Sequence, residues 1–172
     1  AQLMKATFAG YANAEVLTNF PVLMVFGSNL STNGFTYGQM ASSNGWDLVF
    51  MNSNATKTLN YEIEKWNTNG SSYVWVQVPQ LTPDTWIWAY WGDSNLVSVP
   101  AVCTTNGSVW SNGYVSVWHL GEAGGNAHDS TSNGIYGITD TTYGSVNQGV
   151  TGQIGNGCSF SGGYISANGA TL

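Results

Sequence analysis

Short runs in which apolar and polar residues alternate are the dominant pattern along this chain. Such runs recur between clusters of Asn, Gly, Ser and Thr, and no stretch of ten or more residues shows helical periodicity. Strands of this length and spacing predict an all-β protein, an antiparallel β-sandwich or jelly roll. The predicted strands cover residues 3–9, 20–26, 47–52, 59–66, 72–78, 85–91, 115–120, 135–139 and 159–166.

The residue composition changes near residue 98. All three lysines and six of the nine acidic residues precede this point, and the remainder is richer in Gly, Ser, Thr and Asn. We therefore expect a β-sandwich domain over residues 1–98 and a partial or appended Gly/Asn-rich β segment over residues 99–172. Residues 94–107 are the expected junction. The second part is short for an independent sandwich, because small domains bury little of their surface.

The middle of the chain predicts a sheet with two chemically distinct faces. If a hairpin is centred on residues 81–82, Trp75 lies opposite Trp88, and the aliphatic side chains gather on the other face. The rings on the aromatic face belong to Tyr73, Trp75, Trp86, Trp88 and Tyr90, with Gln77 among them.

The preceding strand adds two carboxylates to this face. A tight turn after residue 66 places Glu62 near Trp75 and Glu64 near Tyr73. Rings that stack on pyranoses, together with carboxylates and an amide that bind hydroxyls, favour carbohydrate binding. Two alternatives stay open: the face is a second core buried under the C-terminal segment, or it is a protein interface. A further alternative is a jelly-roll glycoside hydrolase that uses Glu62 or Glu64 with Glu122.

One loop has the oxygen spacing of a calcium site. Asp129, Thr131, Asn133 and Asp140 occupy positions one, three, five and twelve of such a loop, with a glycine at position six. Ca²⁺ is accordingly the one cofactor that the sequence suggests, and the protein needs none for a binding role. The alternative is a turn initiated by Asp129, because Asp readily caps local backbone amides.

The two cysteines, Cys103 and Cys158, are candidates for a disulfide. A bridge that closes a loop of this length stabilises a fold by about 4 kcal/mol in the chain-entropy model. Two buried thiols are the alternative. Composition alone leaves both open.

Charge excludes several partners. Charged residues are 7% of the chain, the net charge is −6 and there is no arginine. Three scattered lysines do not form the basic patch that nucleic acids or anionic membranes require. No apolar stretch approaches the ~20 residues of a membrane span. The uncharged polar composition is typical of secreted β-proteins that contact neutral polymers, so we expect an extracellular or cell-surface location.

Five motifs together resemble a known family. In this order and spacing, they are similar to the bacterial and archaeal domain of unknown function family 2341 over residues 3–95. Val49 stands where that family usually has Arg, and Trp91 where it usually has Tyr. The motifs are Leu17-Thr-Asn-Phe-Pro-Val-Leu23, Gly45-Trp-Asp-Leu-Val-Phe50, Leu59-Asn-Tyr-Glu-Ile-Glu-Lys-Trp66, Val74-Trp-Val-Gln-Val-Pro79 and Ala89-Tyr-Trp-Gly-Asp93.

The C-terminal part resembles the opening of a laminin-G-like, concanavalin A-type jelly roll. The stretches that carry this resemblance are 113–122, 129–134 and 155–165. The two resemblances imply an extracellular, non-catalytic module that binds a polysaccharide or glycan, and they supply no catalytic residues. The competing hypothesis is a structural subunit of a filament or surface layer that self-associates through open sheet edges.

Overall fold

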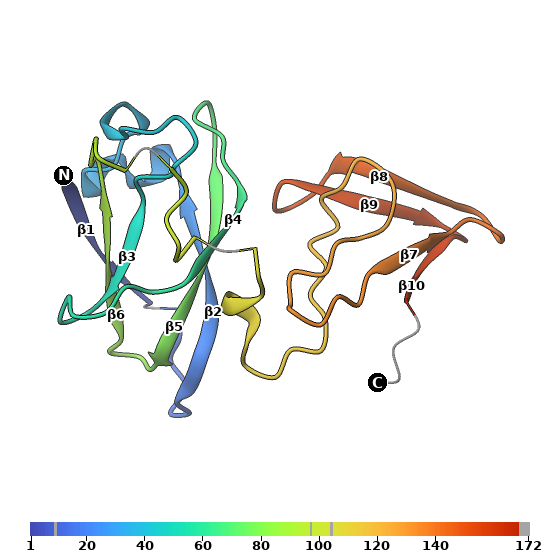
Figure 1. Ribbon diagram of the computed structural model, residues 1–172, viewed down its shortest axis with the longest axis horizontal. Coiled ribbons are helices and arrows are strands. Elements are labelled where there is room, and N and C mark those ends of the chain that lie inside the picture. Colours follow the sequence, from blue (N-terminus) through green and yellow to red (C-terminus); the bar gives the residue numbers. More distant parts are fainter. Residues whose placement is uncertain (9, 97, 104, 169–172) are drawn as a thin grey trace. The chain divides into compact units, whose positions relative to one another are not determined.

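The computed structural model describes residues 1–8, 10–96, 98–103 and 105–168, and this part of the chain is all-β (Figure 1). Its described residues contain three short 3-10 helices, η1 (Ser28–Asn33), η2 (Tyr37–Gln39) and η3 (Ser108–Trp110), and no α-helix. None of the described helices is long and apolar enough to cross a membrane. The strands are β1 (Gln2–Thr7), β2 (Leu17–Phe26), β3 (Val49–Asn52), β4 (Tyr61–Lys65), β5 (Ser72–Leu81), β6 (Trp86–Trp91), β7 (Gly137–Asp140), β8 (Ser145–Thr151), β9 (Asn156–Ser161) and β10 (Tyr164–Ala167).

The chain divides into two compact units, and the division falls inside the expected junction. Unit 1 is Ala1–Thr104 and unit 2 is Thr105–Leu172. All of β1 to β6 belong to unit 1, and β7 to β10 belong to unit 2. Each unit has its own antiparallel sheets, and no closed barrel or jelly-roll arrangement is evident among the described residues.

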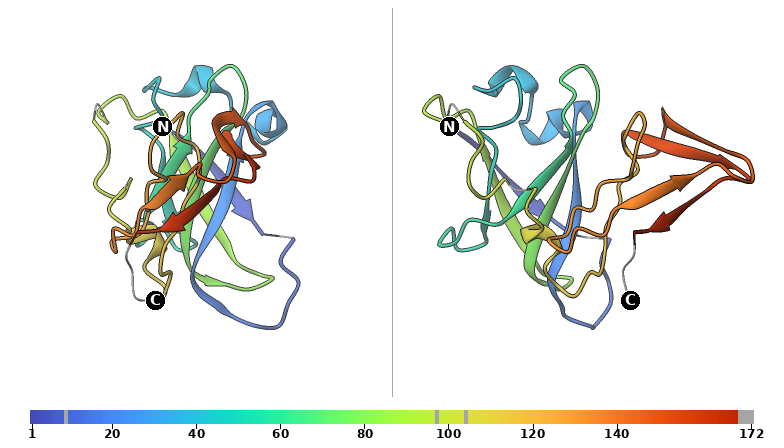
Figure 2. Two further views of the ribbon diagram at one scale, coloured as in Figure 1. Left: turned by 90° about the vertical axis from the view of Figure 1, so that its right-hand side faces the viewer. Right: turned by 45° about the vertical axis from the view of Figure 1, so that its right-hand side comes forward.

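Unit 1 contains two three-stranded antiparallel sheets, with strand orders β1-β6-β3 and β2-β5-β4 (Figure 1). Residues of both sheets form one core. The alternation of β5 explains why: its valines are buried, whereas the side chains between them are half-buried. Residues 28–40, which carry η1 and η2, lie over one end of the strands (Figure 2). The fully buried large side chains include Phe26, Phe35, Phe50, Tyr61 and Trp91.

The expected hairpin between β5 and β6 is not formed, so the predicted register of Trp75 opposite Trp88 is wrong. β5 pairs with β2 and β4, whereas β6 pairs with β1 and β3. The two strands each have one aliphatic face, and these faces pack against each other across the core instead of lying side by side. Face-to-face packing buries both without any further covering layer.

The other half of the predicted register is largely correct. β4 and β5 pair antiparallel with Glu62 opposite Trp75, as expected, and Tyr61 opposite Val76 on the core side. A bulge follows, so Lys65 rather than Glu64 lies opposite Tyr73. The outer edge of β4 is partly covered by the end of unit 1, because the Tyr61 amide donates to the Val102 carbonyl at 2.8 Å.

Unit 2 has two two-stranded sheets, β7 with β10 and β8 with β9. The β7–β10 pair can be followed in Figure 2, where β7 is orange and β10 is red. Two expected strands are corrected here. Residues 115–120 form no strand, because the Val117 amide and carbonyl bond to the Asp129 carboxylate and the Ser130 amide. The stretch 159–166 is two strands, separated at Gly162, whose φ is +78°.

In unit 1 the expected strands differ from the observed ones mainly at their ends. β1 ends at Thr7, and residue 9 of the expected strand lies outside the described residues. β2 begins at Leu17, earlier than expected, and β5 continues to Leu81. In unit 2, the sequence pattern does not predict β8, since Ser145–Thr151 has few apolar residues.

Candidate binding surfaces

The outward face of the β1-β6-β3 sheet carries three of the predicted binding residues. Trp86, Trp88 and Tyr90 alternate with buried residues on β6 and are all half-buried. The ring centroids of Trp86 and Trp88 are 5.1 Å apart at 90°, and those of Trp88 and Tyr90 are 6.4 Å apart at 49°. We call these three side chains the aromatic ladder. Its exposed ring area is the type of surface on which a pyranose stacks.

Two polar contacts hold the indoles of the ladder in place. The Lys5 ammonium lies 4.5 Å from the centroid of the Trp86 ring, a cation–π contact worth about 0.5–1 kcal/mol at an exposed site. The Trp88 indole N–H donates to the Ser53 carbonyl oxygen at 3.1 Å. Since both indoles are anchored, a ligand that stacks on Trp88 meets a partly pre-organised surface.

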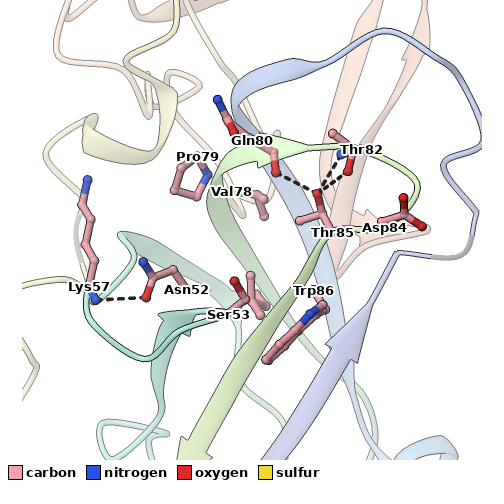
Figure 3. Close-up of a pocket in the computed structure, with 11 residues that line it drawn as sticks. Asn52, Ser53, Lys57, Val78, Pro79, Gln80, Thr82, Asp84, Thr85 and Trp86 are labelled. Carbon is pink, nitrogen blue, oxygen red and sulfur yellow. Dashed lines mark hydrogen bonds between the residues drawn. The ribbon is translucent and has the colours of Figure 1, made fainter.

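A pocket of about 420 Å³ lies at the Trp86 end of the ladder (Figure 3). We call it the ladder-end pocket. Lys57 and Asp84 lie on opposite sides of it in Figure 3. Its polar groups can exchange hydrogen bonds with hydroxyls, and the indole of Trp86 supplies an apolar wall. The lining residues are Asn52, Ser53, Lys57, Val78, Pro79, Gln80, Thr82, Asp84, Thr85, Trp86 and Ile87.

Two small hydrogen-bond networks shape the walls of this pocket. The Asn52 side-chain oxygen accepts from the Thr56 and Lys57 amides at 2.9 and 3.0 Å, which closes the turn after β3. On the opposite wall, the Thr85 hydroxyl accepts from the Thr82 amide at 2.8 Å and donates to the Gln80 carbonyl at 3.0 Å. Both walls are therefore fixed by local hydrogen bonds from side chains to backbone groups of the turns.

The remaining predicted residues lie on the outward face of the other sheet. The Trp75 indole N–H donates to a Glu64 carboxylate oxygen at 2.6 Å. Glu62, opposite Trp75, is only 7% exposed. Tyr73 and Gln77 are half-buried, and in the pairing of β5 with β2 they lie opposite Val25 and Pro21. Trp75 also borders an almost wholly apolar cavity of about 430 Å³, lined by Phe8, Gly10, Tyr11, Phe20, Pro21, Val22, Leu23, Trp75 and Leu81.

The predicted single aromatic face is therefore wrong, although each of its side chains does point away from the core. The ladder is on one sheet, and Tyr73, Trp75, Gln77, Glu62 and Glu64 are on the other, with the core of unit 1 between them. The structure brings together Trp86, Trp88 and Tyr90 on one side. On the other side it brings Trp75 together with Glu62 and Glu64.

The proposed calcium ligands lie in unit 2, where Asp129 organises a turn. Its carboxylate accepts from the Val117, Thr131 and Ile135 amides and from the Thr131 hydroxyl, at 2.8–3.0 Å. Burial raises the pKa of Asp129, but these hydrogen bonds outweigh it and hold the pKa below its ordinary value. Four donors already surround this carboxylate, which is the arrangement of the Asp-initiated turn.

The other two proposed ligands have partners of their own. Asn133 donates through its side-chain nitrogen to the Tyr114 and Val115 carbonyls. Asp140 accepts from the Thr142 amide at 2.7 Å and the Tyr164 hydroxyl at 2.9 Å. Its pKa is lowered by hydrogen bonds with the Thr142 side chain, the Thr142 amide and the Tyr164 hydroxyl. Among the described residues, no group of three or more His, Cys, Asp or Glu side chains could hold a metal ion. Calcium binding stays a prediction.

The two cysteines are free thiols in the structure and belong to different units. Burial raises the pKa of Cys103 above its ordinary value, and a hydrogen bond with Tyr61 offsets only part of this rise. The Cys158 thiol donates to the Leu120 carbonyl at 3.7 Å. Burial and the nearby Glu122 raise the pKa of Cys158. Their pairing also stays a prediction.

Asp47 was missed as a key residue. It is 1% exposed, and its carboxylate accepts from the amides of Ala41, Ser42 and Gly92 at 2.7, 3.0 and 2.7 Å. It thereby ties the loop before β3 to the end of β6. Its position in the Gly-Trp-Asp motif was the available signal. Lys5 and Lys57 were also missed, and their only signal was that lysine is rare in this chain.

Unit 1 is thus an all-β module with two packed sheets and half-exposed aromatic side chains on both outward faces. Residues 44–110 match the family model described as Domain of unknown function (DUF2341). The match contains β3 to β6. It also contains the motifs Gly45–Phe50 and Ala89–Asp93, which are linked by the hydrogen bond from the Gly92 amide to Asp47. It covers a different span from the expected 3–95. No jelly-roll family assignment accompanies the resemblance of the C-terminal part. No curated protein and no solved structure matches the chain.

Proposed function

We propose that unit 1 binds carbohydrate without catalysis, through the aromatic ladder and the ladder-end pocket. The observation that supports this most directly is the continuity of the two features. Three half-exposed rings lead along β6 into a pocket whose polar side chains are amides, hydroxyls and one charge of each sign, beside the apolar Val78, Pro79 and Ile87. Sugars present C–H faces to rings and hydroxyls to polar groups, so this surface matches both of their sides.

The proposed ligand is a polysaccharide or glycan, and an extracellular or cell-surface location goes with that role. The sandwich-like packing of the two sheets in unit 1 leaves the half-exposed rings of β6 on an outward face, where they can carry such a site. A ladder along one strand fits consecutive sugar units of a chain better than a single monosaccharide. We therefore expect oligomers to bind more tightly than monomers.

The test is affinity gel electrophoresis of the whole chain against a panel of soluble polysaccharides, followed by calorimetry on any polymer that retards it. Replacing Trp88 by Ala should cost about 1–3 kcal/mol of binding free energy, the scale of burying a large apolar side chain. That corresponds to a roughly 5- to 150-fold weaker Kd.

The matched control is Trp75→Ala, which removes an indole from the opposite sheet. We expect this variant to bind as the wild type does. Retardation by no polymer, or a loss with Trp75→Ala but not with Trp88→Ala, would contradict the proposal. The second result would instead favour the apolar cavity beside Trp75.

A second candidate function is a structural subunit that self-associates. It is favoured by unit 2, where each of the two sheets formed by the described residues has only two strands, so all four are edge strands, although Gly137 of β7 also pairs with Ala127. Large apolar residues are also exposed there, including Tyr143 at 78%, Val115 at 51% and Phe160 at 47%. Light scattering after size-exclusion chromatography tests this: polymers at micromolar concentration favour the subunit, and a monomer at all concentrations contradicts it.

A further inference from the structure

We propose that the polysaccharide bound by the aromatic ladder is an acidic one, with carboxylate groups on its sugars. This inference rests on the proposed function and adds the chemical class of the ligand. It comes from where the lysines lie. The chain has three, and two of them, Lys5 and Lys57, border the ladder and the ladder-end pocket in a protein whose net charge is −6.

Lys5 stands in the middle of the ladder face. It is exposed, it pairs with Trp88 in the register between β1 and β6, and its ammonium lies over the Trp86 ring. The outward residues around it on β1 and β3 include Leu3, Thr7 and Met51. Among the described residues of β1, β3 and β6, Lys5 is the only one that carries a full charge.

The ring holds this cation where a ligand would lie. A free lysine side chain samples many rotamers, whereas the cation–π contact favours those that place the Lys5 ammonium over Trp86. A sugar stacked on Trp88 would have its substituents next to that ammonium. A carboxylate there forms a charge-assisted hydrogen bond, which is stronger than the bond that a neutral hydroxyl makes.

The ladder-end pocket adds Lys57 but also Asp84, so its own charges balance. The local positive charge therefore comes from Lys5. The overall charge of −6 opposes a polyanion, but its reach is limited, since charges more than ~8 Å away are largely screened at physiological ionic strength. Lys5 is in contact range of a stacked ligand, so its effect exceeds that of the distant carboxylates.

The experiment compares two polymers with the same backbone, polygalacturonate and its methyl ester, which lacks the charge. Binding of the whole chain to each is measured by calorimetry and by affinity gels. We expect polygalacturonate to bind about two- to fivefold more tightly, the range of an exposed charge pair. In Lys5→Met the ratio of the two affinities should fall to about one. In Lys5→Arg it should stay at the wild-type value, because Arg retains the charge and the ring contact.

The matched control is Lys65→Met, on β4 in the other sheet, which should keep the wild-type ratio. Equal binding of the two polymers with a strong dependence on Trp88 would overturn this inference and leave the proposed function standing. An unchanged ratio in Lys5→Met would also overturn it. Binding of neither polymer would overturn this inference, and if no other polysaccharide retards the chain either, the proposed function is overturned with it.

Discussion

The carboxylate of Asp47 should be the most sensitive single polar group in unit 1. We consider its replacement by Asn, which keeps the shape and removes the charge. In the best orientation the amide oxygen keeps the bonds from Ala41 and Gly92, and the amide nitrogen then faces the N–H of Ser42. One hydrogen bond is lost, two donors face each other in a part-buried site, and two bonds become neutral.

The magnitude follows from these losses. An unsatisfied buried group costs about 1–3 kcal/mol, and a bond to a charged group is worth roughly 1 kcal/mol more than a neutral one. Relief of the buried charge offsets part of the sum. We expect Asp47→Asn to lower the free energy of unfolding of unit 1 by about 2–4 kcal/mol, a large part of the ~5–15 kcal/mol that stabilises a typical domain.

The assay is urea unfolding followed by tryptophan fluorescence, with Asp84→Asn as the control. Asp84 is an exposed carboxylate in the same unit, so its replacement should change stability by less than about 0.5 kcal/mol. With an m-value of roughly 1–3 kcal/mol/M, the Asp47 variant should unfold at a clearly lower urea concentration. Equal midpoints for the two variants would refute the reasoning.

Three further predictions concern stability. Asp129 should stabilise unit 2 fully above pH 3.8, its ordinary pKa, and lose that contribution as pH falls further, because its pKa is lowered in the folded protein. Acid unfolding measures this, and Asp129→Asn should remove this part of the pH dependence. Gly107→Ala should destabilise unit 2 by more than Gly113→Ala in thermal unfolding. Both have positive φ, but a Cβ at Gly107 would lie 2.3 Å from a backbone nitrogen, whereas Gly113 has open space. Tyr61→Phe should cost about 1 kcal/mol, since its buried hydroxyl donates a 2.6 Å bond. Burial raises the pKa of Tyr61, so its protonated form stabilises unit 1 fully below its ordinary pKa of 10.0. If the phenolate absorbance of Tyr61 appeared near pH 10.0 in the folded protein, this would be contradicted.

The alternation within single strands could be predicted from sequence because it is local. The valines of β5 and the residues Ile87 and Ala89 of β6 are buried as expected, and their aromatic neighbours point outward. Which strands are neighbours could not be predicted in the same way. A hairpin and a crossing between two sheets leave the same side chains buried, so the burial pattern does not distinguish them. The β4–β5 turn is short, and there the expected pairing of Glu62 with Trp75 is confirmed.

Unit 2 was harder to predict for a related reason. Residues 115–120 have the alternation of a strand, yet their backbone bonds go to Asp129 and Ser130, which are distant in sequence. The ladder-end pocket shows the same limit. It joins Asn52 and Lys57 from one turn with Asp84 from another, and no local pattern indicates that these turns meet.

The pairing of β1 with β6 sets the order in which unit 1 can be assembled. Gln2 pairs with Trp91 and Thr7 with Trp86, so the first strand has its partner only after almost the entire unit has been synthesised. The β4–β5 hairpin closes a short loop and can form first, whereas pairings that close long loops form slowly. In a nascent chain, β1 therefore lacks the strand with which it pairs until β6 has been synthesised. Any truncation that removes β6 takes from β1 its partner strand and leaves β3 paired only with residues 57–59, so both strands gain an exposed, aggregation-prone edge.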